Sequence, residues 1–222
     1  MNAPARPRLG HFARENGWLL LAHKIAGASV RRLRDKLLAR RLKTSQMRLG
    51  RAPKLAGLAH IRLGPNFSAG DGLWLEAVTS FAGVEYSPLI AIGANINFSD
   101  HVHVACTNRV TIADGVLSGS HVIITDHSHG IYAGEDQSPP DVRPVERPLS
   151  NDRSVNIGRN VWLGDGVAVL GGADIGEGSV IGANAVVNGP IPAHCIAAGA
   201  PARPIRRWNP ATKQWDRWTQ SV

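Results

Sequence analysis

Cysteine is scarce in this chain of 222 residues, which contains only Cys106 and Cys195, and aromatic residues make up just 5%. Two distant cysteines exclude a disulfide framework and a structural zinc site of the usual spacing, so a reducing, cytoplasmic compartment is the default. Gly and Pro are frequent, at 24 and 14 residues. That balance favours short strands joined by turns over long packed helices.

Acidic residues are almost missing from residues 1–54, which hold 2 Asp and Glu against 14 Lys and Arg. The rest of the chain holds 15 Asp and Glu against 11 Lys and Arg, so the formal net charge of +8 comes from this N-terminal arm. A basic arm is suited to peripheral contact with an anionic membrane surface. We expect no nucleic-acid partner, because the arm has neither a recognition motif nor interleaved aromatic residues.

Long apolar runs are missing as well. The start, MNAPARPRLGHFARENG, has no apolar segment of signal-peptide length. The most apolar stretch, WLLLAHKIAGASV, is too short to span a bilayer and contains His23 and Lys24. We therefore expect a cytoplasmic protein that can be peripheral to the inner face of the membrane.

A helix is predicted over residues 15–45. One face of the segment VRRLRDKLLARRLK is expected to carry its apolar residues, Val30, Leu33, Leu37, Leu38 and Leu42. These side chains would pack on the main domain or on a neighbouring subunit. Alternatively, the helix would lie on a membrane surface.

Beyond residue 54 the sequence repeats with a period of six. From Ile157 the hexads are IGRNVW, LGDGVA, VLGGAD, IGEGSV, IGANAV and VNGPIP, each opened by an aliphatic residue, and Ala193 opens a seventh. The same frame opens at residues 92, 98 and 104 and, after a two-residue insertion, at 112, 118 and 124. A weaker copy opens at residue 63.

One large aliphatic residue in every six fits neither a helix nor an alternating strand. It predicts an all-β triangular coil, in which three short strands make one turn of about 18 residues and the hexad openers stack inside. Gly and Asn would form the tight corners. The chain is thus divided into a basic, mainly helical arm (1–54), a β domain (55–206) with one long, proline-containing loop (128–154), and a tail (207–222).

Over residues 54–206, the motifs of this domain resemble those of the hexapeptide-repeat acyltransferases. The resemblance rests on INFSDHVHVACTNRVTIADGV, ITDHSHG, NVWLGDGVAVLGGADIGEGSVIGANAVV and IPAHCIAAGAPARPIRRW. Within the family, the chain is similar to the O-acetyltransferases of lipopolysaccharide, O-antigen and exopolysaccharide assembly and to the galactoside and maltose acetyltransferases. The resemblance implies a left-handed parallel β-helix, a homotrimer, acetyl-CoA as co-substrate and a sugar or polysaccharide acceptor.

The segment ITDHSHG holds the candidate catalytic base. Acetyl transfer to a sugar hydroxyl needs a base near neutral pH, which suits histidine, and hydrogen-bond donors for the oxyanion, which backbone amides at glycine corners could provide. The resemblance assigns the first histidine, His127, as general base and leaves His129 to the acceptor site. Asp126 is not expected to partner His127, because adjacent residues on a strand face opposite ways.

Further acceptor-binding residues are expected in the earlier hexads: Asn97, Ser99, Asp100, His101 and His121. His101 and His121 are both fourth residues of hexads one coil apart, so they should stack at one corner. Such a pair also admits a zinc site like that of the gamma-class carbonic anhydrases, which share the solenoid. The C-terminal AAGAPARPIRR resembles users of coenzyme A instead, so we expect no metal.

In this family coenzyme A lies along the C-terminal coils between adjacent subunits. The matching positions are Asp165, Ala183 and Asn188 for the pantetheine, and Arg203 and Arg206 for the nucleotide phosphates. Trp162 would pack beside the site or serve plain structural packing. Relatives often carry Thr-Lys where this chain has Asn188 and Gly189. The arginines should therefore contribute more of the phosphate binding, or the affinity for the donor should be lower.

The predicted function is that of an acetyl-CoA-dependent O-acetyltransferase acting on a sugar hydroxyl of a surface polysaccharide or its precursor. An N-acetyltransferase acting on an amino sugar could use the same donor and base. A zinc-dependent protein similar to the gamma-class carbonic anhydrases and a non-catalytic scaffolding solenoid are the remaining alternatives.

Overall fold

A computed structural model describes residues 14–150 and 152–219 of the chain. Its long helix, α2, spans Trp18–Arg41 and confirms the helix predicted near the N-terminus. Two short 3-10 helices lie at Leu58–His60 and Pro144–Glu146. In the part of the chain that the structure describes, no helix is both long and apolar enough to cross a membrane.

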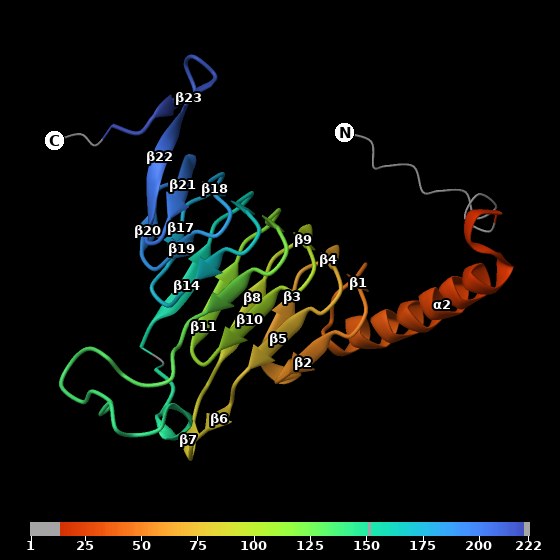
Figure 1. The fold of residues 1–222 in the computed structure, drawn as a ribbon, viewed down its shortest axis with the longest axis horizontal. Coiled ribbons are helices and arrows are strands. Elements are labelled where there is room, and N and C mark those ends of the chain that lie inside the picture. The colour runs from red at the N-terminus through yellow and green to blue at the C-terminus, as the bar shows by residue number, and fades with distance from the viewer. Residues whose placement is uncertain (1–13, 151, 220–222) are drawn as a thin grey trace.

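Three sheets of mainly parallel strands form the body of the molecule (Figure 1). Sheet A contains β1 (Arg48–Leu49), β4 (Phe67–Ala69), β9 (Ile96–Phe98), β12 (Leu117–Ser118), β15 (Trp162–Leu163), β18 (Val180–Ile181), β21 (Cys195–Gly199), β22 (Ala202–Asn209) and β23 (Gln214–Arg217). Sheet B contains β2 (Lys54–Ala56), β5 (Trp74–Ala77), β10 (His103–Cys106), β13 (Ile123–Thr125), β16 (Ala168–Val169) and β19 (Val186–Val187). Sheet C contains β3 (Ile61–Leu63), β8 (Leu89–Ile92), β11 (Arg109–Ile112), β14 (Ser154–Ile157), β17 (Asp174–Ile175) and β20 (Pro190–Ile191).

From β3 to β21 the chain visits the sheets in a fixed cyclic order, C, then A, then B. The predicted all-β class is thereby confirmed, and three strands per circuit are consistent with a hexapeptide-repeat β-helix. The left-handed sense of the coil stays a prediction.

The hexad openers stack inside, as predicted. In sheet C one column of paired residues runs through Leu63, Ile92, Ile112, Ile157, Ile175 and Ile191, all buried. Equivalent columns in sheets A and B include Phe98, Leu163 and Ile181, and Leu75, Val104 and Ile124. Fully burying a side chain of this size contributes about 1.5–3 kcal/mol, so these columns are the main apolar source of stability.

The prediction that a seventh hexad opens at Ala193 is wrong. Ile191 pairs with Ile175 in sheet C, whereas Ala193 is exposed in the following turn. Only Asn188 and Gly189 separate β19 from β20. This corner is two residues shorter than the hexad frame requires, and the shortening brings the larger apolar side chain, Ile191, into the core.

Three rows of corners connect the sheets, and each is named here by the sheets it joins. The A–B corners follow sheet A, the B–C corners follow sheet B, and the C–A corners follow sheet C. Asn95 and Asn160, at C–A corners, have φ values of 58° and 54°, and His101 and His121, at A–B corners, have 57° and 58°. The expectation that asparagine allows tight corners is confirmed, since it is among the residues that tolerate this left-handed region best.

Helix α2 closes one edge of sheet A. Its Asp35 accepts a hydrogen bond from the Leu49 amide at 3.1 Å, and Arg34 donates to the Leu49 carbonyl at 2.8 Å. Both groups belong to β1, the edge strand, whose polar backbone atoms would otherwise invite pairing with another chain. Leu42 is buried in the adjacent core.

The prediction of a single apolar face for this helix is wrong. Leu38 and Leu42 pack on the core, but Val30, Leu33 and Leu37 are exposed. With roughly 100° between successive residues, Leu38 and Leu42 point about 100–140° away from Leu37. The leucines therefore form two stripes, and only one of them packs on the domain.

The B–C corners carry the insertions. A small hairpin, β6 (Ser80–Phe81) and β7 (Val84–Glu85), leaves after β5. The next circuit has a short insertion at Thr107 and Asn108, and the circuit after that has the predicted long loop, between β13 and β14. Figure 1 shows the hairpin and the long loop on the same side of the molecule. Only the long loop and the two-residue insertion were expected; the hairpin was missed.

Candidate active site

His127 lies at a B–C corner, two residues after the end of β13 and at the start of the long loop. Its side chain is only 12% exposed, and its Nδ1 lies 2.9 Å from Oδ1 of Asp126. The hydroxyl of Thr125 lies 3.3 Å from the same nitrogen. The prediction that Asp126 would not partner His127 is therefore wrong. Strand alternation ends with β13 at Thr125, so it does not apply to the two residues that follow.

The Asp126 carboxylate is completely buried and is held by the two-residue insertion of the preceding circuit. Oδ1 accepts the Thr107 amide at 2.9 Å, and Oδ2 accepts the amides of Asn108 and Arg109 at 2.9 and 2.8 Å. The Cys106 thiol donates to Oδ2 at 3.2 Å. Three successive backbone amides thus converge on one carboxylate.

Burial acts to raise the pKa of Asp126, but the hydrogen bonds from His127, Thr107 and Asn108 outweigh it and hold the pKa below its ordinary value. The carboxylate is therefore ionised at neutral pH and can only accept hydrogen bonds. Nδ1 of His127 must then carry the proton. In this tautomer the lone pair is on Nε2, where the imidazole can accept a proton.

Burial also raises the pKa of the Cys106 thiol strongly, and the adjacent charge of Asp126 adds to the effect. A thiol held in its neutral form is a poor nucleophile. Its place in the site is that of a hydrogen-bond donor to Asp126.

A pocket of about 360 Å³ lies beside His127. Its walls come from the two ends of the long loop and from the B–C corners of the next two circuits: Asp126, His127, Ser128, Gly130, Ile131, Tyr132, Ala133, Ser150, Asp152, Arg153, Leu170, Gly171 and Asn188. Asn188, expected at the donor site, is thus brought into one pocket with His127. The volume falls within the range of small-molecule sites.

The base of the long loop is clamped. The Ser150 amide donates to the Ser128 carbonyl at 3.1 Å, and the Gly130 amide donates to the Pro148 carbonyl at 2.8 Å. His129 and Leu149 form an isolated antiparallel bridge between these contacts. The chain therefore leaves and re-enters the circuit at adjacent points, and His127 is fixed where it leaves.

His129 is exposed and contacts the neighbouring insertion. Its ring lies edge-on to Phe81 of β6, with 5.0 Å between centroids. Tyr86, which follows β7, accepts the Leu149 amide at 2.9 Å. The missed hairpin thus supports the long loop. The only signal for it in the sequence is a break of the hexad frame at FAGVEY.

Another histidine near His127 was not predicted. His103, on the outer face of sheet B, stacks on Trp74 with 4.1 Å between centroids, and Lys54 lies over the same indole at 4.8 Å. Burial lowers the pKa of His103, and the nearby Glu76 opposes this. Among the described residues its buried Nε2 has no hydrogen-bond partner. The hexad frame identifies His103 only as an outward-facing strand residue.

The remaining expected acceptor residues lie away from His127 in the chain described by the structure. Ser99, Asp100, His101 and His121 belong to A–B corners, and Asn97 lies on the outer face of sheet A. The predicted stacking of His101 on His121 is confirmed, with 5.0 Å between ring centroids and 13° between planes. Across the described ranges, no group of three or more His, Cys, Asp or Glu is placed to hold a metal ion.

Most expected donor residues also lie on the sheet A side. Asp165 accepts the Ser120 amide at an A–B corner, Ala183 occupies the next such corner, and Trp162 is half exposed on sheet A. Arg203 and Arg206 are exposed on β22. Of the expected donor residues, only Asn188 lines the same pocket as His127.

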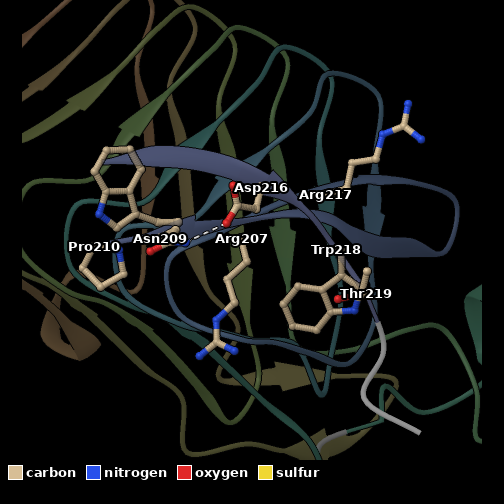
Figure 2. A pocket seen from close by; sticks show the side chains of 8 residues that line it. Arg207, Asn209, Pro210, Asp216, Arg217, Trp218 and Thr219 are labelled. Carbon is tan, nitrogen blue, oxygen red and sulfur yellow. Dashed lines mark hydrogen bonds between the residues drawn. The ribbon is translucent and has the colours of Figure 1, made fainter. Parts of the chain in front are cut away.

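A second pocket, of about 550 Å³, lies on the hairpin formed by β22 and β23 (Figure 2). It is lined by Arg207, Trp208, Asn209, Pro210, Asp216, Arg217, Trp218 and Thr219. Asn209 donates to Asp216 at 2.8 Å (Figure 2). It shares no residue with the His127 pocket and contains no proton-accepting histidine, so it is not the candidate centre for acyl transfer.

Comparison with known proteins places these features in a family. Residues 154–189 match the model described as bacterial transferase hexapeptide (six repeats). The chain is 42% identical over 158 residues to an Escherichia coli protein named as a lipopolysaccharide biosynthesis O-acetyl transferase, WbbJ, covering 71% of this chain and 76% of the relative. It is 31% identical over 153 residues to the galactoside O-acetyltransferase of Escherichia coli, covering 67% of each.

Among solved structures, the fold is similar to AntD, an N-acyltransferase from Bacillus cereus determined with dTDP and coenzyme A. The TM-score is 0.61, the sequence identity is 16%, and the match covers 76% of this chain and 84% of that one. At this identity the likeness concerns the fold alone. The match to the hexapeptide model and the two sequence relatives show that the chain belongs to the hexapeptide-repeat acyltransferases and is an acetyltransferase.

Proposed function

We propose that this chain is an acetyl-CoA-dependent O-acetyltransferase that acts on a sugar hydroxyl of a surface polysaccharide or its precursor, with His127 as the general base. The observation that carries the proposal is the contact of His127 Nδ1 with the buried Asp126 carboxylate, at the wall of a pocket shared with Asn188. The names of the relatives support acetyl transfer to an oxygen and a lipopolysaccharide setting.

In the proposed reaction, Nε2 of His127 takes the proton of the acceptor hydroxyl while the hydroxyl oxygen attacks the thioester carbonyl of acetyl-CoA. The tetrahedral intermediate collapses with cleavage of the carbon–sulfur bond. The leaving thiolate takes the proton back from His127. Asp126 acts as a positioning residue that fixes the tautomer and stabilises the imidazolium formed in between.

The oxyanion donor is proposed at the Gly171 corner, which lines the pocket. A side chain at Gly171 would place Cβ 2.6 Å from the Asp126 carbonyl oxygen, so the two corners are in direct contact. Only glycine permits this approach. Because Gly171 and His127 line the same pocket, a backbone amide of the Gly171 corner is the proposed donor. Preorganised donors of this kind are worth about 10²–10³-fold in rate.

The homotrimer is proposed from the separation of the expected site residues. His127, His129 and Asn188 belong to B–C corners, whereas Asp100, Asp165 and the other expected residues belong to A–B corners or sheet A. A neighbouring subunit that presents its A–B corners to the B–C corners of the first would complete the site. Arg203 and Arg206 would hold the phosphates of coenzyme A.

The division into an arm of residues 1–54, a left-handed β-helix of residues 55–206 and a tail of residues 207–222 is part of the proposal. So is a cytoplasmic location. N-acetylation of an amino sugar is the second candidate function, because AntD, which has a similar fold, is an N-acyltransferase.

The deciding experiment uses matched acceptors that carry either a hydroxyl or an amino group at the same sugar position. Thiol release from acetyl-CoA measures turnover, and alkaline hydroxylamine treatment distinguishes an ester from an amide product. We expect turnover with the hydroxyl acceptor and a hydroxylamine-sensitive product. Turnover with only the amino acceptor would replace the proposal by N-acetylation, and no turnover with any sugar would refute both.

A further inference from the structure

Helix α2 has an apolar stripe that the fold leaves uncovered. Leu19, Val30, Leu33 and Leu37 have 85, 70, 61 and 56% of their surface exposed. Val30, Leu33 and Leu37 are three and four residues apart, and Leu19 precedes Val30 by eleven residues, about three helical turns. These four side chains therefore lie along one face of the helix.

The other side of the helix is the one bound to the domain. Asp35 and Arg34 bond to Leu49, and Leu42 enters the core. Figure 1 shows that α2 extends outward from the end of the sheets beside β1 and β2. The exposed stripe thus faces away from the domain while the helix is anchored to it.

The charge around the stripe is of one sign. The sequence of α2 contains seven Lys and Arg and a single acidic residue, Asp35, which is buried against Leu49. At roughly 100° per residue, Arg41 falls on one side of the stripe, and Lys36 and Arg40 on the other. All three are exposed.

We propose that α2 lies flat on an anionic lipid bilayer, with the stripe of Leu19, Val30, Leu33 and Leu37 among the lipid chains and the flanking cations at the headgroups. An apolar stripe with basic side chains on both flanks is the pattern of in-plane membrane helices. A second copy of this helix fits less well, because the flanking cations of two copies would face each other. The inference is independent of the proposed reaction.

The test is co-sedimentation of the full-length chain with phosphatidylcholine vesicles, with and without about one third phosphatidylglycerol, at physiological salt. We expect binding only to the anionic vesicles. Leu33→Ser combined with Leu37→Ser should weaken it at least tenfold, whereas Val145→Ser, at an equally exposed valine of the long loop, should not. Lys36→Gln with Arg40→Gln should weaken binding and reduce its dependence on salt.

Point substitutions are used because deleting the arm would also remove Leu42 and Asp35, which the domain needs. Circular dichroism checks that each variant keeps its helix. Absence of wild-type binding to anionic vesicles, or equal binding by the leucine variant, would overturn the proposal. So would a smaller mass for the leucine variant in sedimentation, which would assign the stripe to a second copy. His127→Ala should bind vesicles like the wild type, so loss of activity and loss of membrane binding are separable.

Discussion

The Asp126 carboxylate lies 2.9 Å from Nδ1 of His127, although the two residues are adjacent in the chain. Both follow the last residue of β13, and the amides of Thr107, Asn108 and Arg109 hold the carboxylate in place. A short insertion in one circuit therefore fixes the tautomer of a histidine in the next.

His127→Ala should lower kcat by about 10²–10⁴-fold, the usual contribution of a general base, while the affinity for coenzyme A measured by calorimetry stays unchanged. His129→Ala is the matched control. We expect it to change mainly the KM for the acceptor, because His129 is exposed and faces Phe81. Loss of kcat in the His129 variant alone would transfer the role of base to that residue.

Asp126→Asn should lower kcat by at least about 10²-fold, since an amide nitrogen facing Nδ1 would favour the wrong tautomer. It should also lower the free energy of unfolding by on the order of 3 kcal/mol, because converging amides lose a charged acceptor. A variant with normal kcat and reduced stability would show that Asp126 is only structural.

The stability effect of Asp126 should depend on pH in one direction. Its folded-state pKa lies below the ordinary value, so its contribution is complete above about pH 4 and is lost as the pH falls through the folded-state pKa. The difference in free energy of unfolding between wild type and Asp126→Asn should therefore be constant near neutrality and shrink in acid. Denaturant titrations at a series of pH values measure this, and a difference that grows in acid would contradict the assignment.

Gly171→Ala should impair turnover without unfolding the chain, because its Cβ would lie 2.6 Å from the Asp126 carbonyl oxygen and would push the two corners apart. We expect a fall in kcat of roughly 10-fold or more. Gly189→Ala is the control, since no atom lies within 4 Å of a Cβ there. Equal kcat values for the two variants would remove the contact from the mechanism.

Arg203→Ala and Arg206→Ala should each raise the KM for acetyl-CoA and change kcat less, because contacts to the nucleotide end are similar in the ground and transition states. Arg159→Ala, which removes an exposed arginine paired with Glu177, is the control. An unchanged donor KM in both test variants would exclude these arginines from the donor site.

Sedimentation equilibrium should give a trimer at micromolar concentration. The expected site residues occupy two different rows of corners, so a stable and active monomer would contradict both the assembly and the shared site. At an acetyl-CoA concentration too low for the Arg203→Ala,Arg206→Ala variant to turn over, mixing its subunits with His127→Ala subunits should restore some activity if a site combines residues from two subunits.

Most of the strand positions could be predicted, because the aliphatic hexad openers are periodic and each fills the same inner column. Ile92, Ile112 and Ile157 identify sheet C before any tertiary contact is known. The six-residue period predicted the wrong core residue at Ala193, because a corner shortened by two residues brings Ile191 into the core instead. A shortened corner changes the spacing of the core residues but leaves the residue types of the corner ordinary. The only sign of it in the sequence is that a larger apolar residue, Ile191, lies near the expected position.

The site could be predicted less completely. His127 follows from its motif and from the loop that begins after it. Its contact with Asp126 does not, since that depends on the end of β13 and on amides from another circuit. The prediction of one apolar face for α2 was wrong for a similar reason. Leu37 and Leu38 are adjacent in sequence, and only the packing of the helix beside β1 decides which of them is buried.

The hydrogen bonds at the base of the long loop allow the rest of the loop to be replaced by other sequences. Ser128 and Ser150 hold the chain at its points of departure and return, so the length and composition between them can change without moving His127. Natural variation or engineering could therefore replace residues 131–147 as a cassette and alter which acceptor is chosen, while the acyl-transfer chemistry on the strand side is kept.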